Sequence, residues 1–340
     1  MTTAIYIIIF ILGLMFGSFS SVLISRLKTG EGGIMNGRSH CPKCNHVLGG
    51  LDLIPVFSYL FSAGKCKYCK EKISILYPFL EIVMGLLFFL STYFLIDLNL
   101  IINGSLFEIL KLVLVLFISF IAFVLTVYDI LYLEIHDGIM GVGIAIVFIA
   151  LIAQTINPNL AFFSTMNFLE NPLNLSIYAI IVSSAIIGIL YTIIFAGLKE
   201  IYDLGLVALA IGIALLFKIC FNINFSDFPI LWGTMGALGL FIFFFLQIFV
   251  SKGAWMGAGD LRIAIFMGLI LGGFYTLIGG FLTYLIGSVI GILIMIASKL
   301  KGGQTSQLAV PFGPFLAIGL MLTLYFQADL EKVFNMIINK

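Results

Sequence analysis

The chain has 340 residues, of which 62% are hydrophobic and 10% are charged, with a formal net charge of +1. A mean hydropathy of +1.21 excludes an ordinary soluble domain. The near-neutral charge argues against a nucleic-acid-binding protein, whose interface needs a concentrated basic surface.

Long apolar runs follow one another along the sequence. Backbone polar groups inside lipid must pair internally, so such runs form helices or a closed barrel, and their continuous pattern favours helices. Gly272-Gly273 divides a stretch that is too long for one crossing, which predicts a tight helical hairpin. The runs lie at about 4–24, 73–96, 109–128, 138–155, 176–198, 204–221, 230–250, 261–273, 275–298 and 309–327. We therefore expect an all-α polytopic membrane protein with about ten transmembrane helices.

One polar block, between the first two runs, divides the chain into three parts. We interpret residues 1–25 as a first membrane span that is retained rather than cleaved, 26–72 as a small module, and 73–340 as a multi-span membrane domain. Lys and Arg concentrate in cytoplasmic loops. Counting loops alternately places most of the 17 basic residues on the side of the module: Arg26, Lys28, Arg38, Lys43, Lys65, Lys67, Lys70, Lys72, Lys199, Lys252, Arg262, Lys299 and Lys301. Only Lys111, Lys218, Lys332 and Lys340 fall on the other side, so we expect the module to be cytoplasmic.

Four of the five cysteines form two C-x-x-C pairs inside this module. The pairs are Cys41-Pro42-Lys43-Cys44 and Cys66-Lys67-Tyr68-Cys69. Four thiolates in two such turns supply the closed tetrahedral set of a structural Zn²⁺ site, and this favours zinc over a pair of disulfides. His40 and His46 flank the first pair and are interpreted as surface residues, and Cys220 as a small core residue without a function.

Two aspartates lie at the ends of apolar runs, and both fall at the cytoplasmic membrane edge in this topology. Asp129 follows one run, and Asp260 closes Gly257-Ala258-Gly259-Asp260. Carboxylates at a membrane edge are costly and are often retained for chemistry. Two that share a proton can act together as the acid and base of an aspartic protease. Interfacial acids are also often only solvated, as Asp97, Asp137 and Asp203 illustrate.

Taken together, these residues resemble the bacterial type IV prepilin peptidases, also called prepilin leader peptidases, of the Gly-x-Gly-Asp intramembrane aspartic protease group. The matching residues follow chain order: Gly17-Ser18-Phe19, Arg38-Ser39, the two cysteine pairs, Ile54-Pro55, Tyr77-Pro78, Glu81, Asp129, Asp137, Met256-Gly257-Ala258-Gly259-Asp260 and Pro311-Phe312-Gly313-Pro314.

The resemblance implies an enzyme of the bacterial inner membrane that removes the basic leader from prepilins and pseudopilins of type IV pilus and secretion systems. Cleavage would occur at the cytoplasmic face, and the catalytic aspartates of the family map onto Asp129 and Asp260. Many members then N-methylate the new amino terminus, usually Phe, with S-adenosylmethionine, and the methyl transfer is associated with the cysteine module. The implied partners are prepilins and the lipid bilayer, and no nucleic acid.

The chain departs from the family pattern at several places. His136 stands where the family usually has proline, Leu53 replaces a frequent asparagine, and Leu76 replaces a frequent arginine. The last two lie around the cysteine module, so a peptidase without methyltransferase activity is an alternative. The segment 156–229 is longer than usual and is predicted to add a two-helix hairpin.

Five further residues are candidate contacts of the substrate or the methyl donor. Glu81 lies inside the second apolar run and either makes such a contact or pairs with a basic residue of the module. Asp137 either caps the following helix or takes part in chemistry, and Arg262 either stabilises the Asp260 anion or anchors at the interface. Gly257 and Gly259 would allow a substrate backbone to approach closely. A proton-coupled secondary transporter and a non-enzymatic scaffold are the rival functions, but no inverted repeat supports the transporter.

Overall fold

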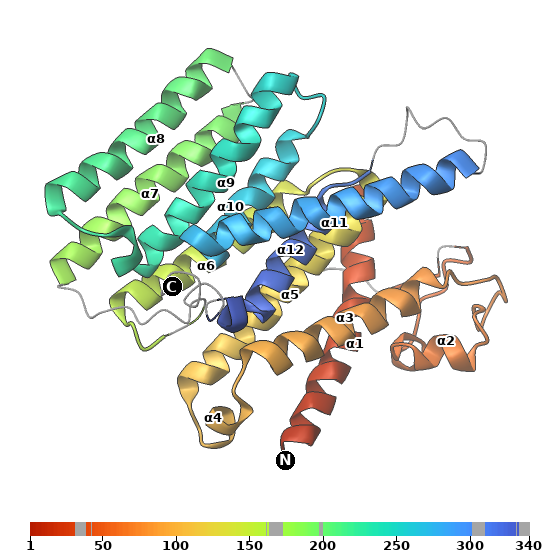
Figure 1. Cartoon of the computed structure of the whole chain (residues 1–340). Helices are drawn as coiled ribbons and strands as arrows, with labels where there is room; N and C mark the ends of the chain where they lie inside the picture. The colour runs from red at the N-terminus through yellow and green to blue at the C-terminus, as the bar shows by residue number, and fades with distance from the viewer. Residues whose placement is uncertain are drawn as a thin grey trace. The chain divides into compact units, whose positions relative to one another are not determined.

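The computed structural model describes residues 1–30, 39–41, 43–160, 162, 173–196, 200–300, 310–330 and 332. Within these residues the fold is entirely helical, apart from two isolated β-bridges in the cysteine module (Figure 1). Eight of the described helices are long and apolar enough to cross a membrane. The expected all-α polytopic membrane fold is confirmed.

The chain forms two compact units, residues 1–128 and 129–340. The first unit contains two long helices, α1 (Thr2–Thr29) and α3 (Leu76–Leu95), that pack tightly together. Glycines on α1 permit this approach, because a Cβ at Gly17 would lie 2.6 Å from the Cα of Glu81. The unit also contains η1 (Gly50–Leu53), α2 (Phe57–Phe61), α4 (Leu98–Ile102) and most of α5 (Leu106–Tyr132).

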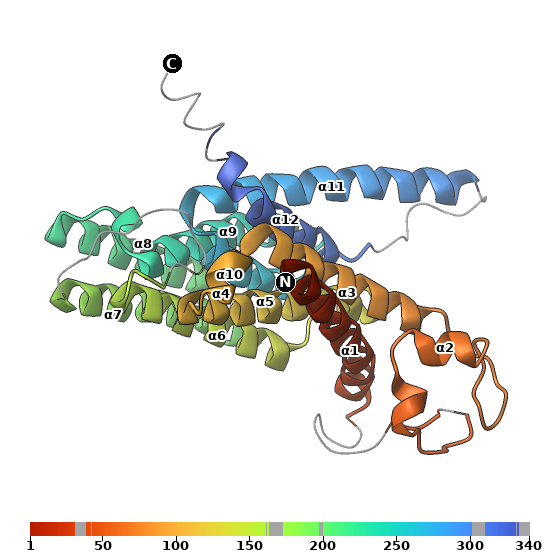
Figure 2. The ribbon, with the colours of Figure 1, turned by 90° about the horizontal axis from the view of Figure 1, so that it is seen from below.

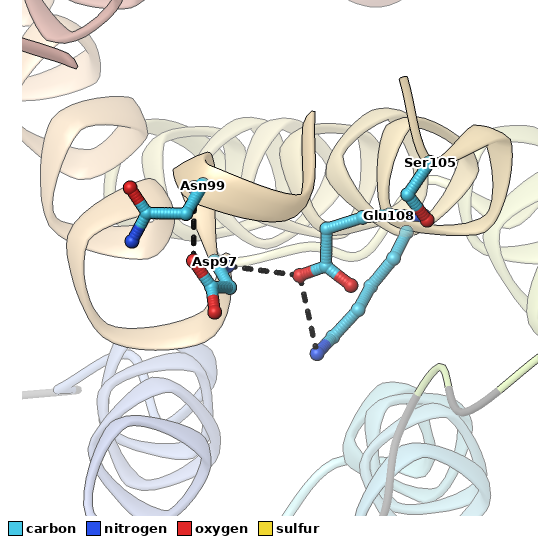
Figure 3. Close-up of polar contacts among 5 residues, drawn as sticks. Asp97, Asn99, Ser105 and Glu108 are labelled. Atoms are coloured by element: carbon cyan, nitrogen blue, oxygen red, sulfur yellow. Dashed lines mark hydrogen bonds and ion pairs between the residues drawn. The ribbon is translucent and has the colours of Figure 1, made fainter. Parts of the chain in front are cut away.

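A polar corner joins α3, α4 and α5 in this unit (Figure 3). The Asp97 side chain caps α4 by accepting from the backbone N–H of Asn99, at 2.9 Å. Glu108 accepts from the backbone N–H of Asp97 at 2.9 Å and pairs with Lys111 at 3.7 Å. These bonds fix the connection between two membrane-length helices, and Asp97 therefore has a structural role here.

The second unit contains the last turn of α5 and seven further α-helices. They are α6 (Asp137–Ile156), α7 (Leu173–Ala196), α8 (Glu200–Phe221), α9 (Pro229–Ser251), α10 (Ala258–Leu271), α11 (Gly273–Leu300) and α12 (Gly313–Tyr325), with the short η2 (Phe225–Asp227) before α9. Helix α10 lies inside this bundle, in contact with α6, α7, α9, α11 and α12 (Figures 1 and 2). Its residues from Ile263 to Leu271 are all buried.

Close backbone contacts hold α10 and α12 in place. A Cβ at Gly236 of α9 would lie 2.5 Å from the carbonyl oxygen of Gly268 on α10. On the other side, Gly319 of α12 packs directly on Thr283 of α11. Small residues at such crossings let membrane helices approach to backbone contact. The positions of α10 and α12 are therefore set by their contacts with neighbouring helices.

The predicted break at Gly272-Gly273 is confirmed, because α10 ends at Leu271 and α11 begins at Gly273. Gly272 has φ 67°, and the indole of Trp232 packs where its Cβ would stand. Each of the ten predicted apolar runs corresponds to a helix in the structure, eight of membrane length, whereas α10 and α12 have only 14 and 13 residues. At 1.5 Å per residue they reach about 20 Å, short of a hydrocarbon core of about 30 Å.

The segment 156–229 contains α7 and α8, which pack against each other (Figure 1). Helix α7 also contacts α6, α9 and α10, whereas α8 packs chiefly on α7. Cys220 is consequently exposed on α8, and its expected place in the core is wrong. Residues 161, 163–172 and 197–199 of this segment lie outside the described residues, as do four of the basic residues used for orientation: Arg38, Lys199, Lys301 and Lys340.

Candidate active site and metal centre

The Gly-x-Gly-Asp segment forms the first turn of α10. Gly257 is the N-cap, and the Asp260 carboxyl accepts from its backbone N–H at 3.3 Å, while the Asp260 N–H donates to the Gly257 carbonyl at 3.2 Å. The Asp260 side chain thus makes one half of a capping box, and the backbone carbonyl of Gly257 replaces the side chain that glycine lacks; both satisfy donors that would otherwise be unpaired at the helix start. The motif therefore also has a local structural reason.

The two glycines of this motif have different surroundings. A Cβ at Gly259 would lie 3.0 Å from Cδ1 of Ile135, whereas a Cβ at Gly257 would meet no atom closer than 3.9 Å. Gly259 is thus needed for packing against the loop between α5 and α6. Only Gly257 leaves open space beside Asp260.

Asp129 lies in the last turn of α5 and faces the first turn of α12. Its Oδ2 accepts from the backbone N–H of Gly313 at 2.9 Å, a buried bond between residues 184 positions apart. Gly313 is the first residue of α12, so the carboxyl group sits where a helix N-terminus offers unpaired N–H donors.

The structure brings Asp129 and Asp260 to the same place in the second unit. The carboxyl of Asp129 lies close enough to that of Asp260 to repel its anion. Gly313 links them, because its Cβ position is 2.7 Å from Asp129 Oδ2 and 3.2 Å from Cδ1 of Ile263, one turn beyond Asp260. Their exposed fractions are 6% and 8%, so two acids are held together away from bulk water.

The loop between α5 and α6 leads from Asp129 to the next candidate. His136 is the N-cap of α6, and its Nδ1 accepts from the backbone N–H of Ile139 at 3.5 Å. Asp137 therefore is not the cap that the sequence suggested. Its Oδ1 instead pairs with a guanidinium nitrogen of Arg262 at 3.1 Å, so the charge of Arg262 is directed to Asp137.

The four module cysteines form one cluster. Their sulfur atoms all lie within 4.8 Å of one another, and Cys41 Sγ is 3.9 Å from Cys69 Sγ. A tetrahedral Zn²⁺ with Zn–S bonds of about 2.3 Å requires sulfur separations of about 3.8 Å. The cysteines are free rather than disulfide-bonded, and His40 and His46 are exposed and outside the cluster. The residues present fit a closed four-sulfur metal site.

Both C-x-x-C turns have the same backbone. The backbone N–H of Cys41 donates to the backbone carbonyl of His46, and that of Cys66 to the backbone carbonyl of Glu71. The residue after the second cysteine of each turn has a positive φ, 55° at Asn45 and 60° at Lys70. The backbone N–H groups of Cys44 and Lys43 lower the pKa of the Cys41 thiol to about 6. This favours the thiolate form that a metal ion binds.

A second layer of contacts supports this module. The ring of Tyr68 stacks on that of His46 at 3.6 Å, and its hydroxyl donates to Asp52 at 3.0 Å. The Asp52 carboxylate also accepts from the backbone N–H of Gly49, and these two donors lower the pKa of Asp52. Aromatic and polar contacts thus supplement the small apolar content of the module.

Glu81 of α3 is buried in the first unit, with an exposed fraction of 8%. Its Oε2 accepts from the backbone N–H of Val56 at 2.7 Å, and the hydroxyl of Ser18 on α1 also bonds to it. Val56 has φ 61°, a rare conformation for a β-branched residue. The carboxylate therefore holds α1, α3 and the strained start of α2 together.

A comparison with known families decides what the first unit is similar to. Residues 11–95 match the Bacterial Peptidase A24 N-terminal domain. This segment contains Glu81 and all four module cysteines, so the resemblance noted from the sequence is confirmed here. Asp129 and Asp260 lie outside the matched residues.

Curated relatives carry the same name. A prepilin leader peptidase/N-methyltransferase of Myxococcus xanthus is 42% identical over 83 residues, which are 24% of each chain. Those of Bacillus subtilis and Vibrio cholerae are 43% and 41% identical over 81 and 86 residues, covering 24% and 23% of this chain and 32% and 34% of theirs. The chain thus matches about a quarter to a third of their length. No solved structure matches it.

Ile135, whose methyl groups lie against Gly259, was not singled out in the sequence. His136 and Gly313 were named there, but the cap that the His136 imidazole makes and the bond that the Gly313 N–H donates to Asp129 were not anticipated. The Pro311-Phe312-Gly313-Pro314 run was the only available signal, since a glycine and a proline at a helix start mark a special turn.

Proposed function

We propose that this chain is a membrane aspartic endopeptidase that removes the leader from type IV prepilins or pseudopilins. The observation that carries the proposal is the pair of buried carboxyl groups, Asp129 and Asp260, supplied by α5 and α10 at one place in the second unit. The similarity of residues 11–95 to proteins named prepilin leader peptidase/N-methyltransferase supports the choice of substrate.

In this mechanism the two carboxyl groups share one proton. Each carboxyl accepts one backbone N–H, but the bond from Gly313 to Asp129 (2.9 Å) is shorter than that from Gly257 to Asp260 (3.3 Å), so we assign the ionised form to Asp129 and the proton to Asp260. Asp129 takes a proton from the attacking water while the water oxygen bonds to the scissile carbonyl carbon, and Asp260 gives its proton to the carbonyl oxygen. As the tetrahedral intermediate collapses, Asp129 gives its proton to the departing nitrogen and a hydroxyl of the intermediate returns a proton to Asp260, so the C–N bond breaks and the leader carboxyl and the mature amino terminus are released.

The proposed location is the bacterial inner membrane, with the site at the cytoplasmic face. The excess of Lys and Arg on the side of the cysteine module supports this orientation. Zn²⁺ held by Cys41, Cys44, Cys66 and Cys69 would have a structural role. Four sulfur ligands leave no position for a reacting water, and the binding free energy would stabilise the folded module.

N-methylation of the new amino terminus with S-adenosylmethionine is a second candidate activity. It is favoured by the name of the relatives and by the match of residues 11–95 to the A24 N-terminal domain. Its donor site is not assigned to residues, although Glu81 is the one buried carboxylate among the described residues of this segment.

The test is cleavage of a co-reconstituted prepilin, followed by mass spectrometry. Asp129→Asn and Asp260→Asn should each lower the cleavage rate at least 1,000-fold, since an amide cannot share the proton. Asp329→Asn, which removes an exposed acid paired with Lys332, is the matched control and should leave the rate unchanged. Near-normal cleavage by either site variant would exclude the dyad.

A further inference from the structure

An ion pair joins α10 to the start of α6 beside the proposed dyad. The guanidinium of Arg262 lies 3.1 Å from Asp137 Oδ1, and the side chains have exposed fractions of 18% and 52%. Arg262 follows Asp260 by two residues on α10, and Asp137 follows Asp129 by eight residues, across the α5–α6 loop. Each partner is therefore connected through a short piece of backbone to one of the two acids.

A packing contact reinforces the same junction. Ile135, in the α5–α6 loop, lies against Gly259, and a Cβ at that glycine would be 3.0 Å from Ile135 Cδ1. The α5–α6 connection thus contacts α10 on both sides of Asp260, because Ile135 of the loop meets Gly259 before it and Asp137 at the start of α6 meets Arg262 after it. The backbone N–H of Leu133 also donates to the Asp129 carbonyl at 2.8 Å, so the loop leaves α5 in a fixed direction.

Helix α7 contributes a tyrosine beside this ion pair. The phenol of Tyr191 lies close enough to Arg262 and Asp137 to interact with both charges. Its hydroxyl also stands 3.7 Å from the Cβ position of Gly141 on α6. Since α7 belongs to the segment 156–229, this contact gives part of that segment a place beside the site. Partial removal of water strengthens the attraction between the charges.

We propose that the Asp137–Arg262 ion pair is a positioning device that holds the first turn of α10 against the α5–α6 loop and so sets the separation of Asp129 and Asp260. The proposal deepens the peptidase function and rests on it. Neither residue touches a reacting atom in this assignment. The pair acts through the backbone, where a displacement of about 1 Å can lower a catalysed rate by about 100-fold.

The test uses Asp137→Asn, Arg262→Gln, Arg262→Lys and the exchanged pair Asp137→Arg with Arg262→Asp. In the full-length protein, the first two should lower kcat about 10- to 100-fold with little change in KM. Lysine should retain most of the activity, because it restores the charge. The kcat of the exchanged pair should be at least tenfold higher than that of the less active single variant. Glu108→Gln, which breaks the ion pair with Lys111 in the other unit, is the control and should keep the normal kcat.

Amide hydrogen exchange separates this proposal from the peptidase function. The two single variants should accelerate exchange in residues 257–262 and 130–137, while exchange in the cysteine module stays unchanged. The exchange measurement needs no substrate. A wild-type protein that cleaves no prepilin would therefore refute the peptidase function and leave the structural role of the ion pair still testable by exchange. Unchanged exchange in both variants would overturn the positioning role, and so would normal kcat in both or failure of the exchanged pair to recover.

Discussion

Replacing Gly313 by alanine would place one methyl group against the carboxyl of Asp129. The new Cβ would lie 2.7 Å from Oδ2, whereas ordinary van der Waals contacts begin near 3.4 Å. The carboxyl must therefore retreat by about 0.7 Å if the backbone stays in place. Gly313 does not have a positive φ, so alanine adds no backbone strain, and the change acts through the close contact with Asp129 and a milder one, at 3.2 Å, with Cδ1 of Ile263.

Because the retreat is directed away from the new Cβ and only partly away from the nitrogen, it would lengthen the bond between the Gly313 N–H and Asp129 from 2.9 Å to about 3.4 Å, past the usual range of about 2.7–3.2 Å. A hydrogen bond to a charged group contributes about 1.5–3 kcal/mol. If that stabilisation supports the active form of the dyad, kcat should fall about 10- to 150-fold. The assay is the initial rate of prepilin leader cleavage by purified protein in lipid nanodiscs.

Gly280→Ala is the matched control, since a Cβ at that position of α11 would meet nothing within 4 Å. It should keep the normal rate, and both variants should unfold near the wild-type temperature. A Gly313→Ala protein with a kcat within twofold of wild type would refute the reasoning, because the close contact would then have no consequence for Asp129.

Further outcomes follow for the metal centre, the helix break and the buried glutamate. One Zn²⁺ per chain should co-purify, and replacing Cys41 and Cys44 together by serine should remove it, as elemental analysis can check. Gly272→Ala should lower the unfolding free energy by about 1–3 kcal/mol more than Gly253→Ala, because both glycines have positive φ but only Gly272 has an indole packed against it. Equal melting temperatures of the two variants would contradict this. Glu81→Gln should lower methylation about tenfold and cleavage less, because the Val56 N–H loses a charged acceptor. Mass spectrometry of both products decides this, and parallel loss of the two activities would count against it.

Local patterns in the sequence predicted local structure well. The two C-x-x-C turns bring their sulfur atoms together with little help from the rest of the chain, and the cluster is as expected. Gly272-Gly273 likewise interrupts an apolar run where the helix ends. In both cases a few neighbouring residues determine the backbone.

Contacts between distant residues could not be read in the same way. The partner of Asp137 is Arg262 on α10, and the donor to Asp129 is the backbone of Gly313 on α12. A backbone N–H has no sequence signature, and a carboxylate at a helix start looks like a cap until a neighbouring residue, here His136, is found to occupy that role. The apolar run 309–327 was also longer than α12, which begins only at Gly313, after Pro311 and Phe312.

The break after α10 has a consequence for how the protein adapts to membrane thickness. The Gly272 carbonyl accepts from both the N–H and the hydroxyl of Thr276, at 3.0 and 2.7 Å, so the interrupted backbone meets its hydrogen-bonding needs within the protein. Helix α11, with 28 largely exposed residues, is about 42 Å long and exceeds a hydrocarbon core of about 30 Å. In a thinner or thicker bilayer, α11 would change its tilt to relieve the mismatch. The enclosed α10 would stay with its protein neighbours, and Asp260 would keep its depth.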